Sequence, residues 1–332
     1  MNLKTAIIMT AASCCLLFTS TSAFSQGLLT PPGPPGPTML TLSQIEPRTP
    51  IATNTTPGDA NDVYIITQPG SYYLTTNLVS GGNLNGIEIL ANNVTLDLNG
   101  FALQSVVTPD SYNDGIYISS SQTNILVRNG AINGWCYGVL SASGASANLV
   151  FEQLNVANCF AGLPANNVGI NILGAATIRD CTFVNNGYGI TCNSQKSSSG
   201  CLITGCTISD GTTGIYCAGS GIISGCVANN CIYFGIGVNN AQGFLVSGCT
   251  ANTNGVNIYV NGSQNRIEDN HVTTGGGFGI EVLGGTNNII IRNSVVGGGG
   301  NNYNLTGTQI VGPLITTAGT ITSANPWANF SF

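Results

Sequence analysis

The chain reads Ile203-Thr204-Gly205-Cys206-Thr207-Ile208 and then Gly214-Ile215-Tyr216-Cys217, and it repeats this two-part pattern twice more. The second copy is Ile223-Ser224-Gly225-Cys226-Val227-Ala228 with Gly235-Ile236-Gly237-Val238, and the third is Val246-Ser247-Gly248-Cys249-Thr250-Ala251 with Asn257-Ile258-Tyr259-Val260. Apolar and polar residues alternate within each part, which is the period of a β-strand, and Gly or Asn residues divide the parts. Strands that recur every 20 to 25 residues predict a parallel β-helix, in which each coil buries its inner residues against its neighbours.

The second part of the pattern, Gly-Ile-x-Val, marks the coils along the chain. Its first residues are Gly86, Gly115, Gly138, Gly169, Gly189, Gly214, Gly235, Asn257 and Gly279. These positions predict about nine coils, in a body on the order of 40 Å long at a strand spacing of about 4.8 Å. Insertions at residues 106–113, 158–168 and 193–200 are expected to leave the coil as loops, where solenoids usually carry function.

Equivalent residues of successive coils are expected to form columns, because side chains alternate between the two faces of a strand. The first inward column is predicted to hold Ile87, Ile116, Val139, Ile170, Ile190, Ile215, Ile236, Ile258 and Ile280. The second is predicted to hold Ile89, Ile118, Ile172, Cys192, Cys217, Val238, Val260 and Val282. The residues between them should point outward: Glu88, Tyr117, Leu140, Asn171, Thr191, Tyr216, Gly237, Tyr259 and Glu281.

Residues 1–25 have the organisation of a secretory signal peptide. Lys4 precedes an apolar core, and Ala23-Phe24-Ser25 supplies the small residues of a cleavage site, so we expect cleavage after Ser25. A lipid anchor on Cys14 or Cys15 is the alternative, although Ala11 stands where a lipoprotein signal usually has Leu. We therefore predict a protein that is secreted, extracellular or on the cell surface, or periplasmic in a Gram-negative bacterium, with no membrane span in its mature form.

The segments on either side of the repeat are expected to have separate roles. Residues 26–62 are rich in Pro and Gly and predict a stiff linker. Residues 63–80 contain two strand patterns around Gln68-Pro69-Gly70-Ser71, which predict a β-hairpin that caps the first coil. The β-helix is expected over residues 81–300, and residues 301–332, with Trp327 and Phe330, are expected to cap its last coil.

The composition excludes some classes of function. Of the 332 residues, 45 are Gly and only 6% are charged, while 42% are hydrophobic. This balance fits an apolar interior with a polar, mostly uncharged exterior, whereas a disordered chain would carry more charge and fewer aliphatic residues. The formal charge of −6 and the absence of a basic stripe argue against nucleic acid as a partner.

The repeat resembles that of the pectin-lyase-like superfamily. The resemblance is carried by Ile267-Glu268-Asp269-Asn270-His271-Val272, by Phe278-Gly279-Ile280-Glu281-Val282 and by Ile291-Arg292-Asn293-Ser294-Val295-Val296, and it covers about residues 86–296. It implies an all-β fold, a single-stranded right-handed parallel β-helix. The superfamily includes pectate and alginate lyases, polygalacturonases, epimerases, phage tailspikes and secreted proteins without known activity, so the fold alone does not imply an activity.

The catalytic patterns of the enzyme branches are missing. Polygalacturonase-like hydrolases carry Asn-Thr-Asp, Asp-Asp, Gly-His-Gly and Arg-Ile-Lys, whereas the only histidine here lies in Asn270-His271-Val272. Lyases of the pectate and alginate types need a basic residue near carboxylates that bind calcium, and Lys196 is the only lysine after the signal peptide. The sequence therefore favours a non-catalytic protein, and a polysaccharide lyase or glycoside hydrolase with a non-standard site is the alternative.

The few charged residues fall into two groups. One is a column of Arg128, Glu152 and Arg179, with Asp180 beside the last, and alternating signs at the coil spacing are typical of a salt-bridge ladder. The other holds Arg266, Glu268, Asp269, His271 and Arg292. The second group could bind Ca²⁺ or form an acid–base site, but we favour a solvated face on which Glu268 pairs with Arg292.

Ten of the twelve cysteines follow the signal peptide, and four of them share one column. Cys181, Cys206, Cys226 and Cys249 stand where this repeat often has Asn. Secretion suggests disulfides, yet in-register neighbours direct their Cβ atoms the same way, which suits bridge geometry poorly. We favour buried thiols that pack as small apolar groups. The pairs Cys201–Cys206 and Cys226–Cys231 have no partner set for tetrahedral zinc.

Two functional hypotheses remain, and the favoured one is a secreted structural or binding module. Tyr216 and Tyr259 share an outward column two coil steps apart, about 10 Å, with Gly237 between them as a shallow dip. Tyr117 and Glu281 lie on the same column, so we expect a stripe for an extracellular polysaccharide or a cell-surface component, with no cofactor apart from the Ca²⁺ alternative. The competing interpretation is that tyrosines simply suit exposed strand positions.

Overall fold

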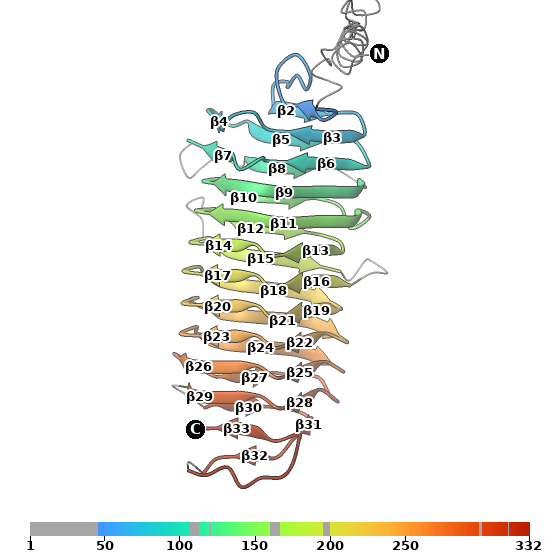
Figure 1. Cartoon of the computed structure of the whole chain (residues 1–332). Coiled ribbons are helices and arrows are strands. Elements are labelled where there is room, and N and C mark those ends of the chain that lie inside the picture. Colours follow the sequence, from blue (N-terminus) through green and yellow to red (C-terminus); the bar gives the residue numbers. More distant parts are fainter. Residues whose placement is uncertain are drawn as a thin grey trace, which may run out of the picture. The chain divides into compact units, whose positions relative to one another are not determined.

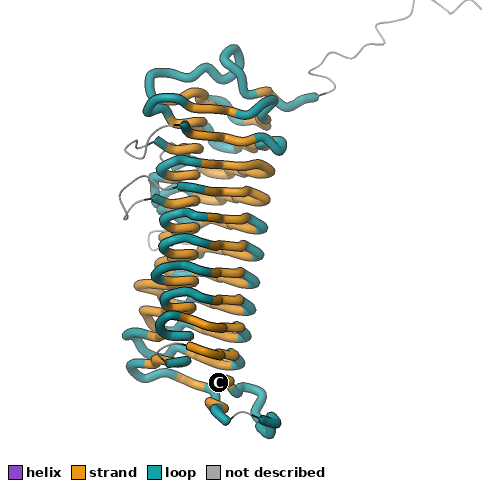
Figure 2. Tube along the Cα trace, turned by 90° about the vertical axis from the view of Figure 1, so that its left-hand side faces the viewer, coloured by secondary structure: helices purple, strands orange, loops and turns teal. Residues whose placement is uncertain are grey.

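The computed structural model describes residues 46–106, 113–119, 121–159, 167–194, 200–298, 301–317 and 319–332. The predicted signal peptide, most of the predicted linker and most of the three predicted insertions lie outside these ranges. Within them, Arg48–Phe332 form one compact unit, which contains strands and no helix. The strands stack coil upon coil into a parallel β-solenoid (Figures 1 and 2).

One wall of the solenoid is an eleven-stranded parallel sheet with one strand per coil. Its strands are β2 (Asp62–Ile66), β5 (Asn85–Ile89), β8 (Asp114–Ile118), β10 (Tyr137–Ser141), β12 (Val168–Ile172), β15 (Tyr188–Asn193), β18 (Thr213–Gly219), β21 (Phe234–Gln242), β24 (Val256–Ser263), β27 (Ile280–Val282) and β30 (Tyr303–Leu305). The nine strands from β5 to β27 are the predicted Gly-Ile-x-Val elements. The segments predicted as caps supply the other two, β2 and β30.

The remaining strands form a 22-stranded sheet that bends in most coils into two arms. The first arm includes β13 (Ala176–Arg179), β16 (Cys201–Thr204), β19 (Gly221–Ser224), β22 (Leu245–Ser247), β25 (Arg266–Glu268) and β28 (Ile289–Ile291). The second includes β14 (Thr182–Val184), β17 (Thr207–Ser209), β20 (Val227–Asn229), β23 (Thr250–Asn252), β26 (His271–Gly275) and β29 (Ser294–Gly298). The earlier coils contribute β1 (Thr49–Pro50), β3 (Gly70–Tyr73), β4 (Leu78–Ser80), β6 (Val94–Asp97), β7 (Ala102–Ser105), β9 (Thr123–Asn133) and β11 (Ala147–Ala157), and the last contribute β31 (Ile310–Val311), β32 (Leu314–Ile315) and β33 (Asn329–Ser331).

A single left-handed residue per coil produces the bend between the two arms. Positive φ occurs at Asp180, Gly205, Gly225, Gly248, Asp269 and Arg292. Gly adopts this conformation without steric cost, and Asp tolerates it better than most residues. The Gly-Cys step of the repeat is therefore a corner, after which the chain starts the second arm.

Both predicted inward columns are confirmed. The register pairs Ile190 with Ile215 and Ile215 with Ile236, and every member of the two columns is buried. Ser141 stands in the second column in the coil of β10, where its hydroxyl is buried without a hydrogen-bond partner. The two columns are otherwise made of aliphatic residues and two cysteines, so their burial is a main force that holds the coils together.

The first position of most Gly-Ile-x-Val elements requires glycine for a steric reason. A Cβ added at Gly86 or Gly214 would lie 2.5 or 2.4 Å from the carbonyl oxygen of the next coil's glycine. No side chain fits at that distance, so the close approach of successive coils requires Gly there. Asn257 replaces Gly in one coil, and its buried side chain accepts a hydrogen bond from Asn254.

The predicted N-terminal hairpin is wrong, although its two strands exist. β2 pairs in parallel with β5 of the eleven-stranded sheet, whereas β3 pairs in parallel with β6 of the other sheet. The turn at residues 67–69 is thus a corner of a first coil rather than the tip of an antiparallel hairpin. At the other end β27 pairs with β30, β28 with β31 and β29 with β33, all in parallel.

The cysteines divide into one disulfide and eight thiols among the described residues. Cys192 and Cys201 are bridged, and this pair, which the sequence analysis did not predict, closes the 193–200 insertion. The Cys181, Cys206, Cys226 and Cys249 column is buried and unbridged, as favoured above. Asn270 and Asn293 continue the column, because the backbone N–H of Cys249 donates to Asn270 Oδ1 at 2.9 Å and that of Asn270 donates to Asn293 Oδ1 at 3.1 Å.

Candidate functional site

Four aromatic side chains form a row on the outer face of the eleven-stranded sheet. The ring centroids of Tyr188 and Tyr216 lie 6.1 Å apart in an edge arrangement, those of Tyr216 and Phe234 lie 6.1 Å apart and stacked, and those of Phe234 and Tyr259 lie 4.5 Å apart and stacked. The residues come from the consecutive strands β15, β18, β21 and β24, and all four are half-buried. We call Tyr188, Tyr216, Phe234 and Tyr259 the aromatic row.

The structure brings the predicted Tyr216 and Tyr259 together, but through a residue that the sequence analysis missed. Phe234 lies between them and stacks on both. A signal for it was present, since Phe234 and Tyr188 each precede the glycine of a Gly-Ile-x-Val element. The residue before the glycine therefore lies on the same outer face as the residue two positions after the glycine, such as Phe234 and Gly237 on either side of Gly235.

Gly237 does not leave the predicted dip. A Cβ added there would lie 2.9 Å from Cδ2 of Tyr216, so the tyrosine ring covers the glycine. The rings of Phe234 and Tyr259 turn one face toward each other at 4.5 Å, and aromatic pairs of this kind gain energy beyond the area that they bury. The row consequently presents ring edges, the hydroxyl groups and the outer faces of its end members.

Amide and carboxylate groups border the aromatic row. The Nδ2 of Asn261 donates to Asn239 Oδ1 at 2.9 Å, and the same two amides hydrogen-bond to Tyr259 and Tyr216 respectively. In the next coils Asn304 Nδ2 donates to Glu281 Oε1 at 2.8 Å. Burial raises the pKa of the Tyr216 and Tyr259 phenols, so both remain neutral at physiological pH and keep an O–H group to donate.

The other predicted members of the binding column take different places. Glu281 pairs in register with Tyr259 and therefore borders the row. Tyr117 stands on the same outward column but four strands away from Tyr216, with Leu140, Asn171 and Thr191 between them. Tyr117 is thus outside the aromatic row, about 19 Å along the column at the usual strand spacing.

The charged group near the C-terminal end is a network of ion pairs. Arg292 contacts Glu268 at 2.6 Å and Asp269 at 2.7 Å, and Arg266 contacts Glu268 at 2.7 Å. The predicted Glu268–Arg292 pair is confirmed. The hydrogen bond from Arg292 lowers the pKa of Asp269, which is opposite to what a general acid requires.

His271 contacts a hydroxyl rather than the carboxylates. Its Nδ1 lies 2.9 Å from Ser294 Oγ of the next coil. Over the described ranges, no group of three or more His, Cys, Asp or Glu side chains is arranged to hold a metal ion. Glu268, Asp269, Arg266 and Arg292 therefore form a salt-bridge network, as favoured over the acid–base or calcium alternative, and His271 lies outside it.

The charged column of Arg128, Glu152 and Arg179 has the predicted order, but one of its ion pairs differs from the prediction. Glu152 lies in register with Arg128 and with Arg179, and Arg179 Nε donates to Glu152 Oε2 at 2.8 Å. Arg128 instead contacts Asp97 of the preceding coil at 3.1 Å, and Arg48 contacts the same carboxylate at 3.3 Å. Asp180 occupies the left-handed corner residue after β13.

Three carboxyl groups at the N-terminal end of the eleven-stranded sheet have raised pKa values. Burial raises the pKa of Asp114 to about 7 and also raises those of Asp62 and Glu88, and charge repulsion from Asp62 or Asp59 raises all three pKa values further. Asn85 connects two of them, because its Nδ2 donates to Asp62 and its Oδ1 accepts the N–H of Asp114. Asp62, Asn85 and Asp114 are the first residues of β2, β5 and β8 and bond one coil to the next there, which gives them a structural role.

The comparison with protein-family models agrees with this architecture. Residues 169–325 match the model of the family described as right handed beta helix region. Among solved structures, the crystal structure of the Dettilon tailspike protein (gp208) is similar over 81% of this chain and 60% of that chain, with 13% sequence identity and a TM-score of 0.44. The chain therefore spans less than two thirds of the length of that tailspike.

No curated protein matches the sequence. The described part of the chain also contains no helix long and apolar enough to cross a membrane. The repeat, the parallel stacking of the strands and the family match lead to one conclusion. The chain folds as a right-handed parallel β-helix.

Proposed function

We propose that the protein is a secreted or surface-exposed module that binds an uncharged polysaccharide along the aromatic row. The observation that carries the proposal is the row itself, four half-exposed rings on consecutive strands. Outward positions of a soluble β-helix need no aromatic stack for folding, because the core lies on the opposite face of the same strands. Aromatic side chains with polar groups beside them are typical of sites that bind ligands with both apolar faces and hydrogen-bonding groups.

The chemistry around the row supports a sugar as the ligand. A pyranose ring offers an apolar face to an aromatic ring and hydroxyl groups to the side. Asn239, Asn261 and Glu281 border the row and supply amide donors and carbonyl or carboxylate acceptors. The formal charge of −6 would repel a polyanionic chain, so an uncharged glycan fits best.

The ion pairs argue for binding without cleavage. Glu268 and Asp269, the carboxylates that the sequence analysis considered for catalysis, are both held by arginines at 2.6 to 2.7 Å. A glycosidase needs a pair of carboxyl groups of which one stays protonated, whereas the hydrogen bond from Arg292 lowers the pKa of Asp269 and keeps it ionised. The aromatic row lies on the other sheet from these residues.

Affinity electrophoresis in gels that contain neutral glycans tests the proposal. Wild type should be retarded by at least one uncharged polysaccharide, and the double variant Tyr216→Ala with Tyr259→Ala should migrate freely. Tyr117→Ala is the matched control, because it removes a tyrosine from the same column outside the row. Retardation that the double variant retains, or no retardation of wild type by any neutral glycan, would refute the proposal.

Export is the second part of the proposal, and the signal-like residues 1–25 support it. Cleavage after Ser25 would give a mature protein that begins at Gln26. N-terminal sequencing of the protein recovered outside the cytoplasm should find this residue. A protein that stays in the cytoplasm with residues 1–25 attached would contradict export.

A further inference from the structure

The first arm of the 22-stranded sheet carries an exposed aliphatic column. Leu202 pairs in register with Ile222, Ile222 with Leu245, Leu245 with Arg266, Arg266 with Ile289 and Ile289 with Ile310. Leu202, Ile222 and Ile310 are 37%, 41% and 54% exposed, and Leu245 and Ile289 are half-buried. We call Leu202, Ile222, Leu245, Ile289 and Ile310 the apolar stripe.

The second arm provides an internal comparison. Its outward column in the same coils pairs Thr207 with Val227, Val227 with Thr250 and Thr250 with His271, so it is mainly polar. Both arms are made of short parallel strands with the same need for residues that favour β-structure. Strand propensity alone therefore does not explain the aliphatic residues of the first arm, and an exposed apolar surface of several side chains, here interrupted by Arg266, usually marks an interaction site.

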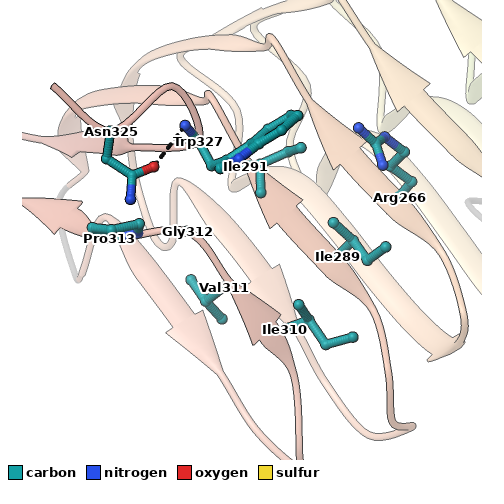
Figure 3. Close-up of a pocket in the computed structure, with 9 residues that line it drawn as sticks. All are labelled: Arg266, Ile289, Ile291, Ile310, Val311, Gly312, Pro313, Asn325 and Trp327. Carbon is teal, nitrogen blue, oxygen red and sulfur yellow. Dashed lines mark hydrogen bonds between the residues drawn. The ribbon is translucent and has the colours of Figure 1, made fainter.

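The apolar stripe continues into a groove at its C-terminal end. The groove has a volume of about 370 Å³ and is lined by Ile289, Ile310 and Val311 on one side and by Trp327 on another (Figure 3). Trp327 is 49% exposed, and the guanidinium of Arg292 lies 5.3 Å from its ring centroid. Arg266, the one charged member of the column, is held by Glu268 at 2.7 Å, so its charge is compensated within the chain.

The spacing of the stripe indicates what covers it. Its members repeat at the coil rise of about 4.8 Å, whereas an α-helix presents side chains at a pitch of about 5.4 Å. Over the five steps from Leu202 to Ile310, the side chains of a straight helix would shift by about 3 Å relative to the side chains of the stripe. Another β-helix has the same rise, and its side chains can interdigitate with the stripe along its whole length.

We propose that the apolar stripe binds a second copy of this chain. Five coil steps plus the groove give a contact about 30 Å long and on the order of 15 Å wide, or roughly 450 Å² per copy. The total of about 900 Å² is below the roughly 1,200 Å² at which stable interfaces begin and falls among weak, transient contacts. The assembly should therefore be weak and concentration-dependent, and it leaves the aromatic row of the other sheet uncovered.

Sedimentation velocity of the mature protein over a range of concentrations tests this inference. Wild type should associate with a dissociation constant in about the micromolar range. Leu202→Lys and Ile222→Lys should weaken association at least about tenfold, because each would bury an ammonium group in the contact. Thr207→Lys is the matched control, since it places the same charge on the second arm of the same coil as Leu202 and should leave association unchanged.

Circular dichroism should show native spectra for all three variants, because each position is outward. A wild type that stays monomeric at about 100 µM, well above a micromolar dissociation constant, would overturn the inference. Association that Leu202→Lys and Ile222→Lys leave intact would overturn it as well.

Discussion

Ile215 and Tyr216 are neighbours in β18, yet their side chains meet opposite environments. Ile215 is fully buried between Ile190 and Ile236, whereas Tyr216 belongs to the aromatic row. Ile215→Asp should abolish folding, because burial of an unpaired carboxylate costs several kcal/mol, which is comparable to the stability of a domain. Tyr216→Ser should keep the native fold. Circular dichroism and urea unfolding measure both, and a stably folded Ile215→Asp protein would contradict the register.

Asp114 gives the protein a pH-dependent stability. Asp114 is 8% exposed, and burial raises the pKa of its carboxyl group to about 7 in the folded protein, while the unfolded chain has a pKa near 4. Between these values the folded protein binds a proton that the unfolded chain does not, so stability falls as pH rises from about 4 to about 7. Asp62 and Glu88, with pKa values raised by burial, act in the same direction.

The free energy of unfolding in urea should therefore be higher at about pH 5 than at about pH 8, by roughly 1–3 kcal/mol. Asp114→Asn should remove most of the difference, because the amide resembles the protonated carboxyl group without its titration. Asn113→Ala controls for a change at the adjacent buried position. Equal stability at the two pH values, or an undiminished dependence in Asp114→Asn, would disprove the role of this group.

At the scale of an element, the cysteine column is a ladder of side chains that lies next to the corner of each coil. Cys206, Cys226 and Cys249 each contact a backbone carbonyl of the previous coil at 3.7 Å, and Asn270 and Asn293 do so at 3.0 and 2.9 Å. Thiols and amides thus fill the same place, and the thiols act mainly through packing.

Thiol labelling distinguishes this ladder from a disulfide-bonded one. After unfolding without reductant, eight of the ten described cysteines should react, and Cys192 and Cys201 should react only once a reductant is added. Mass spectrometry of tryptic or chymotryptic peptides assigns the labels. Resistance of Cys206 or Cys226 to labelling before reduction would contradict the unbridged column.

The elements also show where prediction from sequence succeeds and where it fails. Columns such as Ile190, Ile215 and Ile236 could be predicted because alternation and period determine which face each residue takes. The pairing of β2 and β3 could not, because a strand–turn–strand pattern is the same for a hairpin and for a coil corner. The Cys192–Cys201 bridge depends on how closely β15 and β16 approach each other, and the Arg128–Asp97 contact depends on which of two neighbouring coils supplies the carboxylate.

At the scale of the whole molecule, the solenoid has two outer faces with different chemistry. The eleven-stranded sheet carries the aromatic row with its amides, and the first arm of the other sheet carries the apolar stripe. Tyr216 and Tyr259 could be predicted from the sequence, but Phe234 and the apolar stripe could not. Inward positions must be apolar in every coil, whereas outward positions accept many residue types, so their pattern does not indicate a role. A ligand face and an assembly face on separate walls would allow both to operate together.

Binding of a neutral oligosaccharide by isothermal titration calorimetry tests the central claim most directly. Phe234 has no hydrogen-bonding group, so Phe234→Ala removes no hydrogen bond to the ligand; it removes the central ring and its stacking on Tyr216 and Tyr259. The account predicts that an uncharged glycan bound by wild type binds Phe234→Ala at least about tenfold more weakly, or about 1.4 kcal/mol, whereas Tyr117→Ala binds like wild type. Equal affinity for wild type and Phe234→Ala would contradict the claim that the aromatic row is the binding site.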